Sequence, residues 1–236
     1  MKRILILYII FFSAFFIINK SESAQVKPQE INRFKLKDII KYFPFTKENS
    51  LKEWEEKILK GHVIYKIERD EVDAESYVRA ESDNAASALY YKMPVEIEKC
   101  PVIKWKWCVS EFPKRRFPEK IDLKREEDFA ARIYVIFPAS FFPKSKTIEY
   151  VWAEKLPAGS FGSSAYSKNI KIFVLRSGKC SEDWQHEERD VHKDYIELFG
   201  KEPVLNVGAI AFMTDADSTK TRASALYDEI KIGYKE

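Results

Sequence analysis

The sequence predicts an all-β protein: a single antiparallel β-sandwich of the jelly-roll type, with one short helix near residues 193–199. Two observations lead to this fold class. Apolar and polar residues alternate with a period of two along about ten short segments after Gly61, as they do on strands buried on one face. Helical periodicity is convincing in one internal stretch, whereas a parallel sheet needs a helix between most of its strands. Short strands at this spacing are typical of sandwiches and barrels.

The first 24 residues predict export. Residues 1–3 begin with a basic pair, residues 4–18 are an unbroken apolar run, and residues 19–24 are polar and small. This order is that of a secretory signal peptide, cleaved near Ser23 or Ala24. The apolar run is shorter than the ~20 residues that span a bilayer, so we expect no membrane insertion after cleavage. An uncleaved anchor is the alternative. The expected location is the periplasm or the outside of the cell.

Removal of residues 1–24 takes away Lys2, Arg3, Lys20 and Glu22, a net charge of +2, and leaves a mature chain of +3 − 2 = +1. Nucleic-acid binding needs a concentrated basic surface, so this balance argues against nucleic acid as a partner. The remaining length corresponds to one domain of ordinary size. Aromatic residues make up 14% of the chain, enough to fill a large core.

The mature chain divides into an N-terminal leader segment, residues 25–50, and a β-sandwich domain, residues 51–236. We expect the leader to pack on the domain, and residues 51–60 to form one or two helical turns that end at Gly61. The only other helix is expected over residues 193–199, followed by Gly200 and Pro203.

Ten segments are predicted as strands, and residues 102–109 are the clearest of them. There Ile103, Trp105, Trp107 and Val109 share one face, which we expect to be buried in the core. The ten predicted strands are residues 62–68, 75–82, 87–92, 102–109, 129–137, 148–153, 170–176, 184–192, 204–215 and 223–232.

Three cysteines, Cys100, Cys108 and Cys180, are an odd set for an exported chain. Cys100 and Cys108 lie on one extended run, about 26 Å apart, so they cannot bond to each other. Either one could form a disulfide with Cys180. The alternative is three unpaired thiols packed as small apolar side chains.

A polar constellation suggests a binding site. Arg132 lies in the middle of an apolar strand and needs a carboxylate from a neighbouring strand. The nearest carboxylate-rich segments are residues 184–192 and the end of residues 204–215, so we expect Arg132, Glu187 or Glu188, Arg189 and Asp215 to converge. The predicted ligand-binding residues are Arg132, Trp152, Trp184, Glu187, Glu188 and Arg189.

Asp215, Asp217 and Thr219 have the spacing of oxygen ligands at the start of a calcium loop. The glycine and glutamate of an EF-hand are missing, so the alternative is a turn capped by these side chains. No cofactor is expected; calcium at these three residues is the alternative, and a transition metal on His186, Glu188, Asp190 and His192 is disfavoured because successive residues on one strand face are about 6.6 Å apart.

Five ordered motifs stand out between about Trp54 and the end of the chain. They are EDFAARIYVIF (127–137), EYVWA (149–153), VLRSG (174–178), the run from Trp184 to Gly200, and MTDADST with the closing ALYDEI (213–230). Together they resemble the family called domain of unknown function 3047. The resemblance implies exported bacterial proteins of one domain, and it carries no established activity.

The leading functional hypothesis is a non-catalytic exported protein that binds a glycan or another component of the cell envelope. One alternative is a glycan-cleaving enzyme, hydrolase or lyase, that pairs Glu187 or Glu188 with Asp128 or Asp215. Another is a structural envelope protein without a small ligand. An open face with carboxylates and tryptophans would favour binding or cleavage, and charges that are buried and mutually paired would favour a structural role. The oligomeric state does not follow from the sequence.

Overall fold

The computed structural model describes residues 36–46, 50–71, 74–124, 127–140, 144–179 and 183–235. The predicted signal peptide and the first part of the predicted leader lie outside the described residues. Within the described ranges, no helix is both long enough and apolar enough to cross a membrane.

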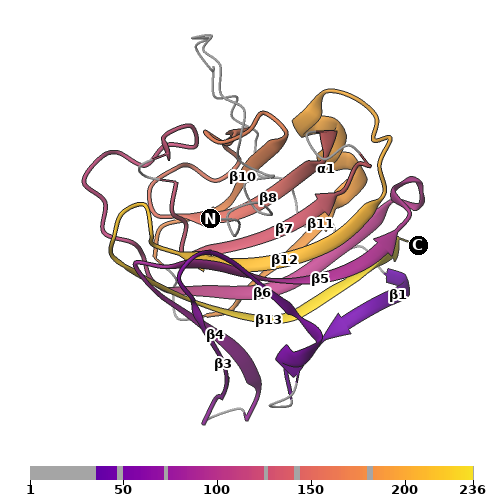
Figure 1. The fold of residues 1–236 in the computed structure, drawn as a ribbon. Coiled ribbons are helices and arrows are strands. Elements are labelled where there is room, and N and C mark those ends of the chain that lie inside the picture. The colour runs from indigo at the N-terminus through magenta and orange to yellow at the C-terminus, as the bar shows by residue number, and fades with distance from the viewer. Residues whose placement is uncertain are drawn as a thin grey trace, which may run out of the picture.

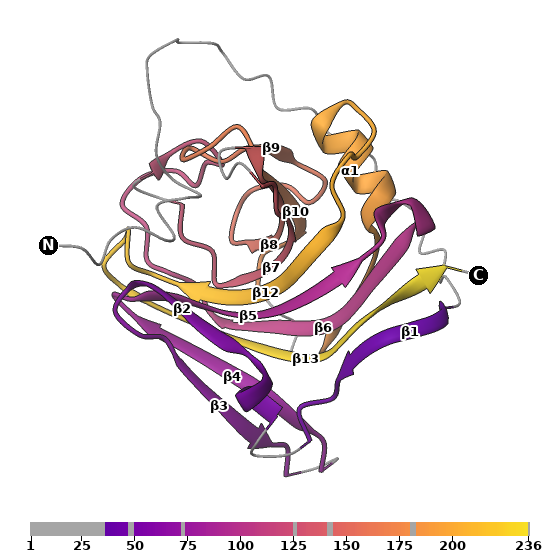
Figure 2. The ribbon, with the colours of Figure 1, turned by 45° about the vertical axis from the view of Figure 1, so that its right-hand side comes forward.

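Two curved sheets pack face to face, which confirms the predicted β-sandwich (Figure 1). The seven-stranded sheet bends so that its face away from the other sheet is concave (Figure 2). Its order is β2 (Glu55–Lys60), β5 (Ala86–Val95), β12 (Val207–Asp215), β7 (Ala131–Phe137), β8 (Lys146–Ala153), β10 (Ile170–Ser177) and β9 (Phe161–Ser163). The six-stranded sheet has the order β11 (Gln185–Asp190), β6 (Pro101–Glu111), β13 (Arg222–Lys235), β4 (Ser76–Asp83) and β3 (Ile64–Arg69), and β1 (Leu36–Phe43) also pairs with β13.

The core lies between the sheets and contains the face predicted for β6. Trp105 and Trp107 are 2% and 0% exposed, and their rings meet edge to face at 5.3 Å. Such aromatic pairs add to the free energy gained by burying apolar surface. The predicted burial of this face is therefore confirmed.

The predicted short helix is present as α1 (Val191–Phe199), two residues longer at its start than expected. The side chain of Asp190 caps the helix by accepting the backbone N–H of Lys193 at 3.0 Å. Gly200 ends it in the left-handed conformation, with φ of 67°. In the sheets, the β8–β10 pair is parallel, whereas the other pairs are antiparallel.

The helical expectation for residues 51–60 is wrong. The segment 51–60 forms only a short 3-10 turn, Ser50–Glu53, and then strand β2, because hydrogen bonding to β5 outweighs its weak helical preference. Part of the predicted leader forms strand β1 of the six-stranded sheet. After β1, Phe45 is fully buried in the core, 6.1 Å from the ring of Trp54.

The cysteines differ in state. Cys108 forms a disulfide, whereas Cys100 is a free thiol. The alternative of three unpaired thiols is therefore wrong for Cys108. Cys180 lies outside the described residues.

Candidate functional site

Arg132 lies at the centre of a buried polar cluster on the seven-stranded sheet. Its neighbour Ile133 enters the core between the sheets, so the Arg132 side chain points to the opposite face. Its guanidinium group makes two hydrogen bonds to Asp215, from Nε at 2.9 Å and from Nη2 at 2.7 Å. It also pairs with Glu149 of β8 and donates to the backbone carbonyl of Glu127.

The charges of this cluster are mutually satisfied. Although burial acts to lower the pKa of Arg132, the charge of Asp215 raises it well above its usual value, so Arg132 stays ionised. Burial and the nearby charge of Glu149 raise the pKa of Glu127 to about 8, against the hydrogen bond from Ser164. A buried, fully paired cluster of this kind fits a structural role better than an open ligand site.

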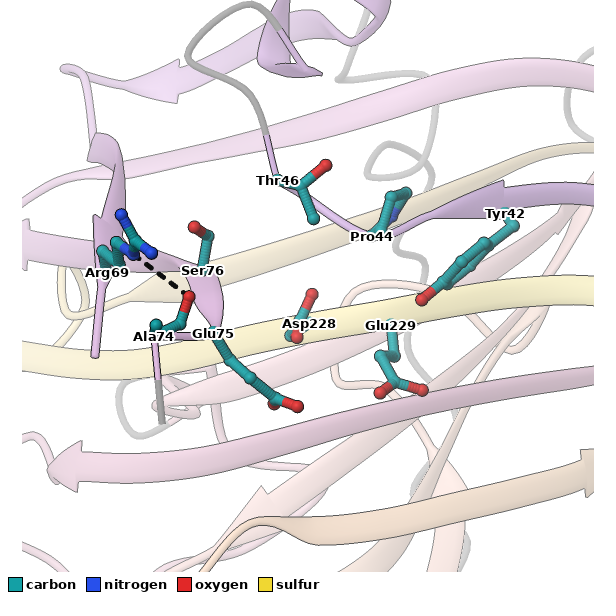
Figure 3. A pocket seen from close by; sticks show the side chains of 9 residues that line it. All are labelled: Tyr42, Pro44, Thr46, Arg69, Ala74, Glu75, Ser76, Asp228 and Glu229. Carbon is teal, nitrogen blue, oxygen red and sulfur yellow. Dashed lines mark hydrogen bonds between the residues drawn. The ribbon is translucent and has the colours of Figure 1, made fainter. Parts of the chain in front are cut away.

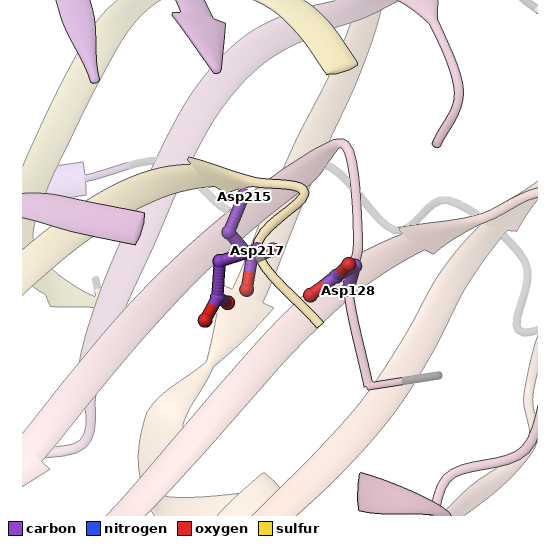
Figure 4. A group of neighbouring side chains, drawn as sticks. All are labelled: Asp128, Asp215 and Asp217. Atoms are coloured by element: carbon purple, nitrogen blue, oxygen red, sulfur yellow. The ribbon is translucent and has the colours of Figure 1, made fainter. Parts of the chain in front are cut away.

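An acidic group lies beside this cluster and includes two of the three predicted metal ligands. One carboxylate oxygen from each of Asp128, Asp215 and Asp217 lies within 4.8 Å of the others (Figure 4). Asp128, which was not among the predicted metal ligands, accepts backbone N–H groups from Ser218 and Thr219 at 3.2 and 2.7 Å. The backbone N–H of Thr219 therefore helps to hold Asp128 in place. Calcium binding here remains a prediction.

The structure does not bring the charged residues of β11 to Arg132. Strand β11 belongs to the six-stranded sheet, and Glu187 points towards the core, where it accepts the indole N–H of Trp107 at 3.1 Å and pairs with Arg176 at 2.6 Å. Arg189 binds Asp194 of α1, with 2.9 Å between its Nε and a carboxylate oxygen. The predicted convergence holds for Arg132 and Asp215 and is wrong for these residues.

The remaining predicted ligand residues are divided between the core and the surface. Trp152 is 3% exposed and donates its indole N–H to the carbonyl of Gly178 at 2.7 Å, so it offers a ligand almost no surface. Trp184 lies at the outer face of the six-stranded sheet, where the Nζ atom of Lys106 is 5.1 Å from its ring. Glu188 is on the same face and pairs with Lys104 at 2.7 Å.

That outer face contains a pocket, here called the outer pocket, which the prediction missed. Its volume is about 540 Å³, within the range of ligand-binding cavities. The end of β1 and the chain after it, the β3–β4 hairpin and the middle of β13 form its walls (Figure 3). Its lining residues are Tyr42, Pro44, Thr46, Arg69, Ala74, Glu75, Ser76, Asp228 and Glu229.

A β-bulge in β13 places two consecutive carboxylates in the outer pocket. Two residues of β13, Glu229 and Ile230, lie opposite the single Trp105 of β6. Glu229 takes a left-handed backbone conformation with φ of 51°. As a result Asp228 and Glu229 both line the pocket, whereas Ile230 is buried in the core. In a regular strand side chains alternate between the two faces of the sheet, so without the bulge the side chain of Glu229 would point into the core.

The outer pocket surrounds one buried amine with carboxylates. The Nζ atom of Lys106 contacts Glu75 and lies 3.1 Å from Asp228 and 3.7 Å from Glu229. Burial raises the pKa of Asp228 to about 6. Although burial acts in the same direction on Glu229, its hydrogen bond with Lys231 lowers its pKa. The Oδ1 atom of Asp228 is buried and has no hydrogen-bond partner among the described residues.

Fold and site together define a β-sandwich protein with an acidic pocket on the outer face of one sheet. The sequence model of the family "Protein of unknown function (DUF3047)" matches residues 52–231, so the chain belongs to this family, as the motifs indicated. No curated protein sequence matches the chain.

Several solved structures share the general architecture at low similarity. The CBM22-1 xylan-binding domain of Paenibacillus barcinonensis Xyn10C is 9% identical with a TM-score of 0.40, over 86% of this chain and 97% of that one. A protein of unknown function with a galectin-like fold from Bacillus subtilis is 10% identical with a TM-score of 0.41, over 85% and 98%. The enzymatically active domain of a bacteriophage CBA120 tailspike is 8% identical with a TM-score of 0.37, and this chain spans only 20% of it.

Proposed function

We propose that the protein is exported and binds a glycan in the outer pocket without chemically altering it. Export is supported by the N-terminal pattern of a basic start, an apolar run and small polar residues. It is also supported by the disulfide at Cys108, because such bonds persist mainly in oxidising compartments.

The observation that carries the proposal is the set of three carboxylates, Glu75, Asp228 and Glu229, that line an open pocket of about 540 Å³. Carboxylate oxygens accept hydrogen bonds from hydroxyl groups. Beside them Tyr42, 41% exposed, presents a ring against which a sugar face can lie. A dense set of hydroxyl donors next to an apolar ring face is the chemistry of a sugar.

The test is a glycan array probed with the mature chain, residues 25–236, followed by calorimetric titration of the glycans that bind. Removing an acceptor in Glu75→Gln, or the ring in Tyr42→Ala, should weaken binding about tenfold or more, which corresponds to one lost hydrogen bond to a charged group or one lost stacking contact. Glu81→Gln is the matched control. Glu81 lies on β4, the strand that also contributes Ser76 to the pocket, but Glu81 is exposed and does not line the pocket. If no glycan on the array binds, the structural alternative is favoured. If all variants bind a glycan with equal affinity, the outer pocket is not the binding site.

A second candidate, glycan cleavage, is favoured by one property of the same pocket. The pKa of Asp228 is raised and that of its neighbour Glu229 is lowered, a division that suits one acid and one base. Protonated Asp228 would give its proton to the glycosidic oxygen, while ionised Glu229 would take a proton from the attacking water. New reducing ends from a bound glycan, abolished in Asp228→Asn, would support cleavage. Bound glycans that stay intact would support binding alone.

A further inference from the structure

Three lysines gather at one end of the seven-stranded sheet, away from the residues that line the outer pocket. Strands β8 and β10 are parallel neighbours, so they begin at the same end, and Lys146 and Lys171 lie at their starts. Their Nζ atoms lie 4.0 and 5.9 Å from the centre of one ring, that of Phe199. Lys201 follows the end of α1, two residues after that ring. Lys146, Lys171 and Lys201 are called the lysine cluster below.

The lysine cluster has no counter-charge in the described part of the chain. No salt bridge joins any of its members to a carboxylate there, and the polar contact of Lys171 is the neutral hydroxyl of Ser163, at 2.9 Å. Burial lowers the pKa of Lys146, and the positive charges of Lys201 and Lys171 lower it further. Burial and the charge of Lys168 act in the same direction on Lys171.

Two lysines on the outer face of the six-stranded sheet, one half-buried and one buried, are compensated. Lys104 pairs with Glu188, and Lys106 pairs with Asp228. The end of helix α1 supplies about half a negative charge, which is less than the three positive charges of the lysine cluster. Like charges held together in a partly buried place repel each other, and an anion removes that cost.

We propose that the lysine cluster binds an oxyanion, a sulfate or phosphate group either free or as an ester on a larger ligand. Ammonium groups are strong, flexible donors to tetrahedral oxyanions. The Ser163 hydroxyl lies beside Lys171 and can add a neutral donor. The ring of Phe199 covers one side of both amines, so their free donors are directed away from it.

The test compares sodium sulfate and sodium phosphate with sodium chloride at equal ionic strength, by titration calorimetry on the mature protein. Sulfate or phosphate should bind to the wild type and to Lys193→Gln, a control at an exposed position on α1. The double variant K146Q/K171Q should lose at least tenfold in affinity, and without added oxyanion its melting temperature should equal or exceed that of the wild type. Equal binding by the wild type and the double variant, or no binding of either anion, would overturn the proposal.

Two further arms make the result unambiguous. If K146Q/K171Q does not fold, Lys201→Gln takes its place, because Lys201 is exposed and lies outside the strands. Lys201→Gln should weaken oxyanion binding severalfold. An unchanged affinity would contradict binding at the lysine cluster. Dextran sulfate and uncharged dextran share one polysaccharide backbone and differ in the sulfate esters. Binding of dextran sulfate but not of dextran would show that the lysine cluster accepts an esterified group as well as the free ion. The variant Glu75→Gln, altered in the outer pocket, should bind the oxyanion with the affinity of the wild type. The oxyanion proposal and the glycan proposal can therefore fail independently.

Discussion

Arg132 connects three neighbouring strands through its charge. It lies on β7, and its carboxylate partners Glu149 and Asp215 lie on β8 and β12. All three side chains are almost completely buried. Because removing one partner leaves a buried charge uncompensated, the cost of a single substitution should be large.

We therefore expect Arg132→Met to destabilise the protein by about 3–5 kcal/mol, measured by urea unfolding. Combined with Asp215→Leu, the loss should be smaller than the sum of the two single losses, because the second change removes a charge that the first one stranded. Losses that add within about 0.5 kcal/mol would show that the two side chains are not energetically coupled.

Asp228 should make the stability depend on pH. Its pKa is about 6 in the folded chain and near 3.8 otherwise, so between these values the folded state holds a proton that the unfolded state has lost. Stability from this group therefore falls as the pH rises from about 4 to about 6. Asp228→Asn removes the effect, so its stability relative to the wild type should rise over that interval in parallel urea titrations. A difference that stays constant with pH would contradict the burial of this carboxylate.

At the scale of elements, the bulge of β13 shapes the outer pocket more than any single residue. It gives the pocket two adjacent carboxylates and keeps Ile230 in the core. The bulge requires a left-handed backbone conformation at Glu229, and this conformation is unfavourable for residues other than glycine.

Glycine at position 229 should relieve this strain. Glu229→Gly and Glu229→Ala both remove the ion pair with Lys231, but only glycine adopts the left-handed conformation freely. We expect Glu229→Gly to be about 1 kcal/mol more stable than Glu229→Ala, by thermal or urea unfolding. An alanine variant as stable as the glycine variant would mean that β13 has no such bulge.

Strand periodicity was sufficient to predict the sandwich, the buried face of β6 and the short helix, since each depends on neighbours in the sequence. Strand pairing depends on distant partners, and this explains the errors. The β2 segment becomes a strand only through β5, and β11 joins the sheet opposite Arg132. The pair Asp228–Glu229 was visible in the sequence, but its common orientation depends on a bulge that only the register with β6 reveals.

Across the whole molecule, charges are arranged in two ways. Around Arg132 they are buried and paired, which fits the stabilisation of the seven-stranded sheet. On the outer face of the six-stranded sheet they line an open pocket. The charges around Arg132 thus support the fold, and the site we propose lies on the other sheet.

The most direct test of this account is a crystal structure of the mature protein with the tightest glycan from the array. We expect the sugar in the outer pocket, with a hydroxyl group within hydrogen-bond distance of the Glu75 or Glu229 carboxylate and a sugar face against the ring of Tyr42. A sugar bound on the concave face of the seven-stranded sheet, with the outer pocket holding only water, would contradict the central claim.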